Sequence, residues 1–172
     1  PFHGASGGTH IATDIWTVHN YEQDPTKLKE KLYNGGKLME APKWEIHLNP
    51  MNIGYNGLKY TDQYAFPEYK KDKPYLIDEF GGIKWNPAQQ TESAQNTSWG
   101  YGEAPRSLEE FYARLEGQVD AVLSLSNDIW GYCYTQLTDV EQEQNGIYYY
   151  DRTPKFDMKR IHAIFSKTPE SK

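Results

Sequence analysis

Cysteine is nearly absent from this sequence, since Cys133 is the one cysteine among 172 residues. A disulfide within the chain is therefore excluded, and so is a zinc site built from several cysteines. Cys133 lies in an apolar, aromatic run, so we expect a buried structural thiol rather than a reactive one.

Long apolar runs and clusters of positive charge are also missing. Without a continuous apolar stretch of about 20 residues, the sequence predicts no transmembrane helix. A net charge of −6 without a Lys/Arg cluster argues against nucleic acid and an anionic membrane surface as partners. The sequence holds no HExxH motif, Gly-rich phosphate loop, dinucleotide fingerprint or serine elbow. We therefore expect neither a metal nor a cofactor.

The first four residues, Pro1-Phe2-His3-Gly4, contain no initiator Met and no basic region followed by an apolar stretch. We interpret Pro1 as an internal position of a longer chain. Targeting signals would then lie outside this sequence, and the compartment stays unassigned.

Aromatic residues are abundant, at 15% of the chain, with 14 Tyr and 5 Trp. Aromatic faces stack on sugar rings, so this composition fits a carbohydrate-binding protein. A core rich in aromatic rings with tyrosine hydroxyls at its rim would give the same numbers. Composition alone leaves both interpretations open.

Three segments rich in β-branched and aromatic residues predict strands, at 14–21, 75–80 and 128–137. Each is followed by a segment with helical spacing of apolar residues. This alternation predicts a single α/β domain with a parallel sheet. Three such units are too few to close a (β/α)₈ barrel. The stretch 37–73 is irregular, and a connection of that length is usually functional or carries small elements of its own.

Helix boundaries are marked by capping residues. Asp24 and Pro25 predict the start of a short helix that ends at Gly35-Gly36. Ser107 and Glu110 match a capping box that opens the clearest helix of the chain. Thr153-Pro154 predicts the start of the last helix, which carries Met158, Ile161 and Phe165 on one face.

Glu79 is the leading candidate for chemistry. It follows an apolar strand and precedes Gly81-Gly82, which allow a sharp turn beneath a ligand. A carboxylate at the carboxyl end of a buried parallel strand is typical of an α/β active site, and it can attack an anomeric carbon. Strand alternation predicts that Asp78 points to the opposite face. Charges exposed at the strand end would be the alternative.

Further polar and aromatic side chains follow the predicted strands or lie in the loops after them. We expect some of them to contact a ligand, and capping or core packing is the alternative for each; they are His19, Asn20, Tyr21, Trp85, Trp99, Tyr132, Tyr134 and Gln136. Alternation places Trp130 on the same face as Tyr132 and Tyr134. The acidic stretch Thr138–Gly146 is interpreted as a solvated or sugar-contacting loop rather than a calcium site.

The order of these motifs resembles that of a known family. DIWTVHNYEQDP, KPYLIDEFGG, SWGYGEAPRSLEEFYARLEGQ and GYCYTQLTDVEQEQNGIYYYDRTPKF together resemble the C-terminal part of the catalytic domain of glycoside hydrolase family 2. That family includes β-galactosidases, β-glucuronidases and β-mannosidases. The resemblance runs from about Asp14 to about Phe156, and the TQLTDVEQEQNG segment is its most specific part.

The resemblance implies a partial (β/α)₈ TIM barrel in which the three strands are numbers six, seven and eight. It implies a retaining β-glycosidase, with Glu79 as nucleophile and Tyr21 as the tyrosine that orients it. The substrate would be a β-glycoside. Two positions depart from common members: Tyr132 stands where many carry a Trp, and Gly82 where some β-galactosidases carry a His.

The acid/base Glu of that family follows an Asn, and this chain contains no Asn-Glu pair. A retaining enzyme needs two carboxyl groups about 5 Å apart, so we expect negligible activity from this polypeptide alone. Its open sheet edges are expected to pair with the rest of the parent barrel or with a second copy. A retaining glycosidase of a related barrel family and a non-catalytic sugar-binding module stay as alternatives.

Overall fold

The computed structural model describes residues 10, 12–39, 69–87 and 98–169. A parallel sheet of three strands forms its centre, with the order β1-β4-β5. The strands are β1 (Trp16–Asn20), β4 (Tyr75–Gly81) and β5 (Gly131–Thr135). They coincide with the three predicted segments: β1 and β5 are shorter than predicted, and β4 extends one residue further, to Gly81. The predicted α/β class with a parallel sheet is confirmed, and the sheet is open.

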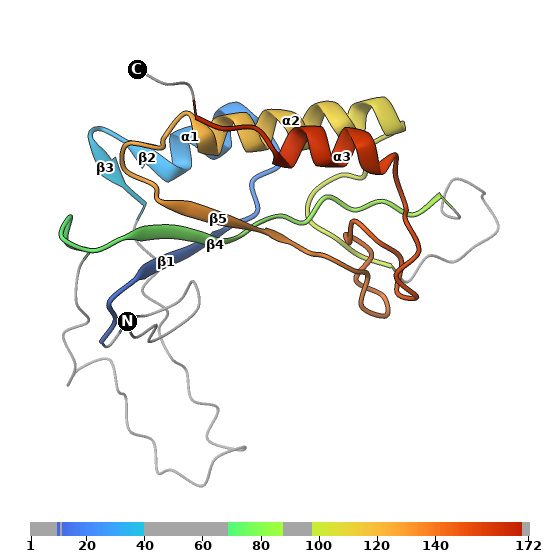
Figure 1. The fold of residues 1–172 in the computed structure, drawn as a ribbon, viewed down its shortest axis with the longest axis horizontal. Helices are drawn as coiled ribbons and strands as arrows, with labels where there is room; N and C mark the ends of the chain where they lie inside the picture. Colours follow the sequence, from blue (N-terminus) through green and yellow to red (C-terminus); the bar gives the residue numbers. More distant parts are fainter. Residues whose placement is uncertain (1–9, 11, 40–68, 88–97, 170–172) are drawn as a thin grey trace, which may run out of the picture.

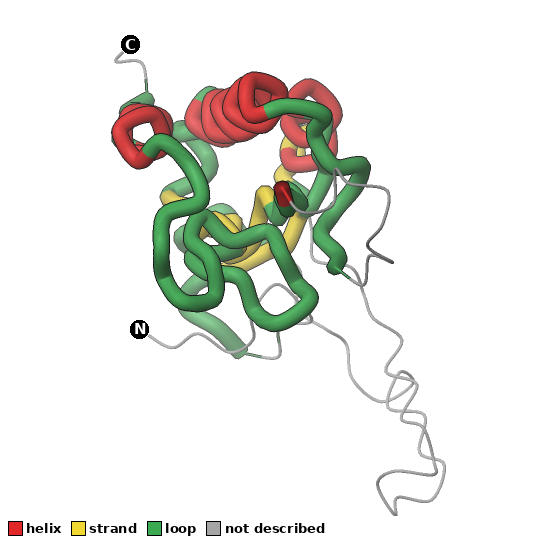
Figure 2. Tube along the Cα trace, turned by 90° about the vertical axis from the view of Figure 1, so that its right-hand side faces the viewer, coloured by secondary structure: helices red, strands yellow, loops and turns green. Residues whose placement is uncertain are grey.

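Three helices cover one face of this sheet, as Figures 1 and 2 show. They are α1 (Pro25–Leu32), α2 (Leu108–Leu123) and α3 (Met158–Phe165). Helix α2 packs against both α1 and α3. Most of the predicted irregular stretch 37–73 lies outside the described residues.

The core lies between the sheet and the helices because both contribute apolar residues at the right period. Tyr75, Ile77 and Phe80 of β4 are fully buried. They belong to one core cluster with the buried apolar residues of α2. The ring of Phe111, on α2, stacks on the ring of Phe156, with the ring centroids 4.1 Å apart. Burial of this kind is the main stabilising contribution to a domain of this size.

The start of α1 follows the prediction, and its end does not. The Asp24 carboxylate caps the helix by accepting from the N–H groups of Thr26 and Lys27 at 2.8 and 3.2 Å. The helix ends at Leu32, before the predicted Gly35-Gly36. Those glycines, with φ of +57° and +80°, turn a small hairpin between β2 (Tyr33–Asn34) and β3 (Lys37–Leu38). Paired glycines with positive φ suit a tight hairpin turn as well as they suit a helix end.

The other two helix starts differ from the predictions in detail. Ser107 accepts from the Glu110 N–H at 3.1 Å, as in a capping box, but the Glu110 carboxylate accepts from the N–H of Arg106 at 2.8 Å. The start predicted for the last helix at Thr153-Pro154 is wrong. Helix α3 begins after Asp157, whose carboxylate accepts from the Lys159 N–H at 2.8 Å.

One residue of the third strand segment is placed differently from what we predicted. Cys133 is exposed, so the expected buried thiol is wrong. Trp130 precedes β5 and is exposed. Strand alternation explains Cys133: its neighbours Tyr132 and Tyr134 take the helix-covered side, which leaves Cys133 on the opposite face of an edge strand.

Candidate functional site

The candidate site lies at the carboxyl ends of β1 and β4, where the regular pairing of the two strands is interrupted. His19 is paired with Glu79, and the register shifts between Val18 and His19. A second irregularity lies between Ile77 and Phe80, where β4 pairs with β5. Asp78 and Glu79 therefore sit in a distorted part of the central strand.

This distortion brings both carboxylates to one histidine. The His19 ring lies 3.0 Å from Glu79 Oε2 through Nδ1, and 3.4 Å from Asp78 Oδ1 through Nε2. The prediction that Asp78 and Glu79 point to opposite faces assumed strict alternation, which the register shifts remove. The three side chains form one polar cluster.

Tyr21 supplies the second contact to the same oxygen, because its hydroxyl donates a hydrogen bond to Glu79 Oε2. Burial raises the pKa of Tyr21 well above its usual value, and the hydrogen bond to the Glu79 carboxylate raises it further. The phenol is therefore neutral at physiological pH and acts as a donor.

The described contacts of Glu79 involve only one of its two carboxylate oxygens. Both contacts converge on Oε2, and no hydrogen bond or ion pair from the part of the chain that the structure describes reaches Oε1. The Glu79 side chain is 34% exposed. A carboxylate fixed by one oxygen and open at the other can serve as a nucleophile or as a general base.

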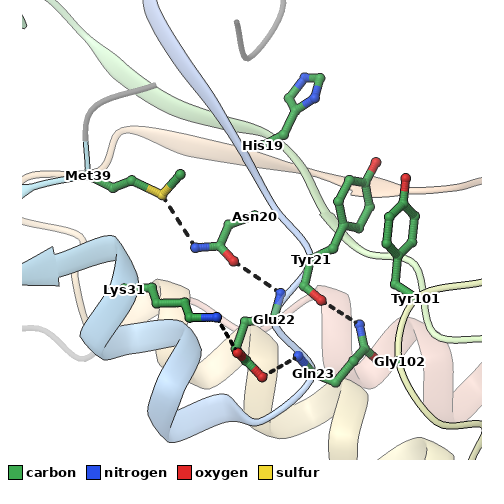
Figure 3. A pocket seen from close by; sticks show the side chains of 9 residues that line it. All are labelled: His19, Asn20, Tyr21, Glu22, Gln23, Lys31, Met39, Tyr101 and Gly102. Carbon is green, nitrogen blue, oxygen red and sulfur yellow. Dashed lines mark hydrogen bonds and ion pairs between the residues drawn. The ribbon is translucent and has the colours of Figure 1, made fainter. Parts of the chain in front are cut away.

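An open pocket of about 690 Å³ lies beside this cluster (Figure 3). His19, Tyr21 and Tyr101 contribute to its wall, and Glu22 with Lys31 closes its other end. The rings of Tyr21 and Tyr101 stand face to face, with centroids 3.5 Å apart. The pocket has the size of small-molecule sites and combines aromatic walls with a few polar groups.

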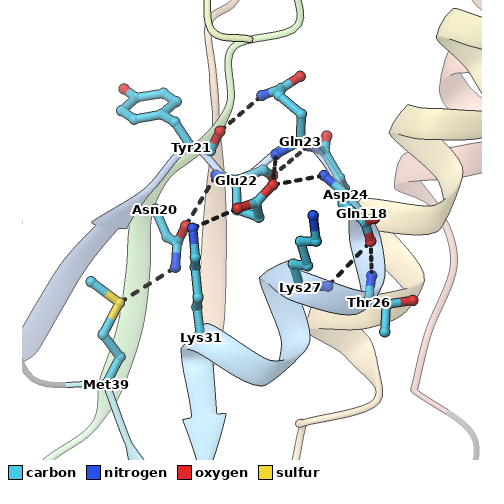
Figure 4. Close-up of polar contacts among 10 residues, drawn as sticks. All are labelled: Asn20, Tyr21, Glu22, Gln23, Asp24, Thr26, Lys27, Lys31, Met39 and Gln118. Atoms are coloured by element: carbon cyan, nitrogen blue, oxygen red, sulfur yellow. Dashed lines mark hydrogen bonds and ion pairs between the residues drawn. The ribbon is translucent and has the colours of Figure 1, made fainter.

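The turn after β1 is built by polar side chains (Figure 4). Asn20 Oδ1 accepts from the Glu22 N–H at 3.0 Å, and Glu22 Oε1 accepts from the N–H groups of Gln23 and Asp24 at 3.0 and 3.1 Å. Lys31 donates to the other Glu22 oxygen at 2.5 Å. That bond, with the Asp24 N–H, lowers the pKa of Glu22. These bonds fix the direction in which the chain leaves Tyr21.

Of the predicted site residues, the structure brings His19 and Tyr21 to Glu79. Asn20 is buried and shapes the turn, although it also borders the pocket. Trp85 is buried and packs against Phe111, with ring centroids 6.3 Å apart. Trp85 therefore belongs to the core.

The predicted residues of β5 do not join the cluster. Tyr134 packs edge-on against Phe80 and Phe165, and its hydroxyl donates to the Asn145 carbonyl at 3.4 Å. Tyr132 also packs against Phe80 on the helix-covered side. Burial raises the pKa of both tyrosines. Gln136 follows the strand and donates to the Glu143 carbonyl at 3.5 Å.

Trp99 does not contact Glu79 in the described structure, but it packs against a residue that lines the pocket, Tyr101. Trp99 is 46% exposed, and its ring packs edge-to-face with the Tyr101 ring, with the ring centroids 5.9 Å apart. Its backbone is tied to the acidic loop by bonds to Gln142 and Gln144 at 2.8 and 2.9 Å. Trp99 is thus an exposed aromatic surface linked to the site through Tyr101.

The sequence reasoning missed Tyr101 and Gln23. The Gln23 amide donates to the carbonyls of Tyr21 and Gly81 at 3.0 and 2.6 Å, which ties the ends of β1 and β4 together. Tyr101 stands between two glycines in the SWGYGE segment, and that isolated aromatic was the available signal. No sequence signal marked Gln23, because its role depends on its contact with Gly81 at the end of the neighbouring strand β4.

The acidic loop is partly a structural element. Asp139 is buried and pairs with Lys155, so it does not belong to a solvated surface. Glu141 is exposed, with φ of +51°. Within the described ranges, no three His, Cys, Asp or Glu side chains gather as metal ligands would. No described helix is long and apolar enough to span a bilayer.

Comparison with known proteins does not assign this chain to a family. No family model matches the chain, and no curated protein matches it.

Proposed function

We propose that this chain carries the nucleophile of a retaining β-glycosidase of the family 2 type, with Glu79 as the attacking carboxylate. The observation that carries the proposal is the position of Glu79, at the carboxyl end of the central parallel strand with the Tyr21 hydroxyl on Oε2. Reactive groups of α/β proteins lie at this edge of the sheet. In this proposal β1, β4 and β5 are strands six, seven and eight of a (β/α)₈ barrel.

The chemistry has two steps in which Glu79 is consumed and regenerated. Glu79 Oε1 attacks the anomeric carbon, a bond forms between them, and the bond to the leaving-group oxygen breaks as that oxygen takes a proton from an acid. Water then attacks the same carbon, its proton passes to the conjugate base of that acid, and the bond to Glu79 breaks. Tyr21 and His19 hold Oε2 throughout, so that the oxygen used for attack stays aimed at the sugar.

Because the sequence contains no Asn-Glu pair, this proposal takes the acid from a part of the protein outside this chain. Asp78 is the carboxylate nearest in sequence to Glu79, but it lies against His19 of the neighbouring strand β1. A partner that supplies the acid would pair with the strands at the two ends of the order β1-β4-β5. The rest of the parent barrel is the partner we expect, and a second copy of the chain is the alternative. Light scattering of the isolated chain tests this, because a monodisperse monomer would contradict pairing through the sheet edges.

The decisive experiment traps the covalent intermediate in the complete protein that contains this chain. A 2-deoxy-2-fluoro β-glycosyl fluoride needs no proton on its leaving group, and the fluorine slows the second step. We expect the sugar on the peptide that carries Glu79, located by peptide mass spectrometry. The Glu79→Gln variant, which keeps the hydrogen-bond acceptor but is a poor nucleophile, should take no label. Sugar binding without label or turnover in the unchanged protein would favour a non-catalytic module and reject the proposal.

A further inference from the structure

We propose that Tyr101 is a positioning residue that holds the Tyr21 hydroxyl on Glu79, and that a glycine at position 82 is required for this arrangement. The inference deepens the proposed function and rests on it, because it concerns how the nucleophile is oriented. Tyr101 contacts Tyr21, which in turn contacts the reacting carboxylate.

The ring contact between the two tyrosines is unusual in its geometry. Their planes are inclined by only 4°, and the centroids lie 3.5 Å apart (Figure 3). Aromatic pairs prefer an offset or edge-to-face arrangement, because the quadrupoles of two rings repel in a direct sandwich. The attraction between the rings therefore does not explain this arrangement, and the backbone on both sides must impose it.

The backbone of Tyr101 is bonded to the segment that directly follows β4, the strand that carries the nucleophile. The Tyr101 N–H donates to the Gly82 carbonyl at 2.9 Å, and Tyr101 forms a parallel bridge with Ile83. Gly82 in turn donates to the Thr135 carbonyl at 2.7 Å, which links it to the end of β5. The Tyr101 ring consequently has a fixed position relative to Glu79.

The backbone of Tyr21, the second residue of the ring pair, is also fixed by hydrogen bonds. Its carbonyl accepts from the Gln23 amide, which also bonds to Gly81 at the end of β4. The side chain keeps two rotatable bonds, and a half-buried ring beside an open pocket has room to turn. The face of Tyr101 removes that room, so the hydroxyl stays on Glu79 Oε2.

Gly82 lies beneath both rings. A Cβ at this position would come within 2.3 Å of Tyr101 Cδ2 and within 2.9 Å of Tyr21 Cδ1. Its φ of +61° also disfavours any residue with a side chain. A single methyl group at position 82 would therefore push the two rings away from their places. The requirement for glycine follows from the tyrosine pair as well as from the turn.

The test measures whether Tyr101 acts through Tyr21, in a double-mutant cycle on the complete protein with an aryl β-glycoside. Loss of a hydrogen bond to a charged group predicts that Tyr21→Phe lowers kcat about 10- to 100-fold. Tyr101→Leu should lower kcat about tenfold or more in the unchanged background, yet less than about twofold when Tyr21→Phe is already present. Tyr101→Phe keeps the ring and should stay within about threefold of the unchanged protein. Tyr150→Leu, at an exposed tyrosine, is the matched control.

A merely structural role for Tyr101 would give a different pattern. Equal losses from Tyr101→Leu in both backgrounds, or a change in KM alone, would overturn the positioning role. Gly82→Ala gives a second route, because it should reproduce the kcat loss of Tyr101→Leu while the thermal unfolding curve shows a folded protein. An active Gly82→Ala enzyme with unchanged kcat would reject the requirement for glycine.

A crystal structure of the Tyr101→Leu variant separates the two proposals. We expect the Tyr21 hydroxyl to leave Glu79 Oε2, and an unmoved hydroxyl would overturn the inference whether or not the protein is a glycosidase. Failure of the unchanged protein to take label at Glu79 would instead reject the proposed function. The variant structure would still decide whether Tyr101 positions Tyr21.

Discussion

Two carboxylates of this protein, Asp139 and Glu79, each contact a nitrogen-bearing side chain, and the two contacts differ in how exposed they are to solvent. Lys155 and Asp139 are almost completely buried, with side-chain exposures of 0% and 7%. The His19 and Glu79 side chains are 29% and 34% exposed. The first pair ties Asp139, which follows β5, to Lys155, and the second stands beside an open pocket.

The contacts of the two carboxylates explain the difference. Lys155 Nζ lies 2.8 and 3.0 Å from the two oxygens of Asp139, and the Gly146 N–H donates to one of them at 2.9 Å. Burial lowers the pKa of Lys155, and the hydrogen bond and charge of Asp139 act in the opposite direction. Both oxygens of Asp139 are used inside the protein, whereas the contacts of Glu79 converge on Oε2. Contact with a basic side chain is thus common to both carboxylates, and what distinguishes Glu79 is that its described contacts use one oxygen only.

The largest expected effect separates activity from stability at Glu79. In the complete protein, Glu79→Gln should lower kcat by a factor on the order of 10⁴ or more, as loss of a nucleophile does. The free energy of unfolding should change by less than about 1 kcal/mol, because a partly exposed pair contributes little. Steady-state kinetics and urea unfolding of the same preparation measure both quantities. A large loss of stability with retained activity would reverse the roles assigned to the two pairs.

Breaking the buried pair should have the opposite profile. Lys155→Met leaves Asp139 charged, buried and without its cation, which costs about 3–5 kcal/mol of unfolding free energy. Replacing both residues by apolar ones, as in Lys155→Met with Asp139→Leu, should recover part of that loss. Urea unfolding of the two variants provides the comparison. Equal stability of Lys155→Met and the unchanged chain would show that the pair contributes nothing.

Glu22 provides an intermediate case with a defined pH dependence. Its pKa is lowered in the folded state, mainly by the hydrogen bond from Lys31. A carboxyl group of this kind stabilises the fold above its ordinary pKa of 4.5, and the contribution is lost as the pH falls through the lower folded value. Glu22→Gln should therefore cost less than about 1 kcal/mol at pH 7. The difference from the unchanged chain should shrink progressively below about pH 4.5, as measured by urea unfolding at a series of pH values. A difference that grows on acidification would contradict this assignment.

The smallest effect is expected at a surface pair, whose Arg160 and Glu109 side chains are 43% and 77% exposed. Glu109 accepts two hydrogen bonds from Arg160, at 2.6 and 2.9 Å, at the surface of α2 and α3. Exposed pairs are screened by solvent and lose side-chain entropy, so Glu109→Gln should leave the melting temperature unchanged within error. A clear drop in melting temperature would mean that exposure is a poor guide to the value of an ion pair in this protein.

Local signals in the sequence predicted the elements of the fold well. The apolar segment ending in Glu79 became the central strand, and the spacing of Phe111, Leu115 and Val119 became the buried face of α2. Asp24 and Ser107 cap their helices as expected. Cap and period signals act within a few residues, so they can be read without knowledge of the neighbours.

Predictions that depended on a neighbour were less successful. Cys133 was expected to be buried because its segment is apolar, but only the choice of helix-covered face decided its exposure. Tyr132 and Tyr134 were correctly placed on one face, and that face proved to point toward α2 and α3. The clustering of Asp78 with Glu79 came from a register shift, which alternation along one strand does not reveal.

Residue type and the apolar strand before Glu79 are local properties of the chain, so the chemical groups of the candidate site could be predicted without knowing the fold. Which of these groups meet depends on tertiary packing. Tyr21 and Glu79 are 58 positions apart, and Tyr101 reaches Tyr21 only through the turn at Gly82. Contacts of this kind depend on strand order, register and the direction of each turn, and these are fixed only when the elements pack together.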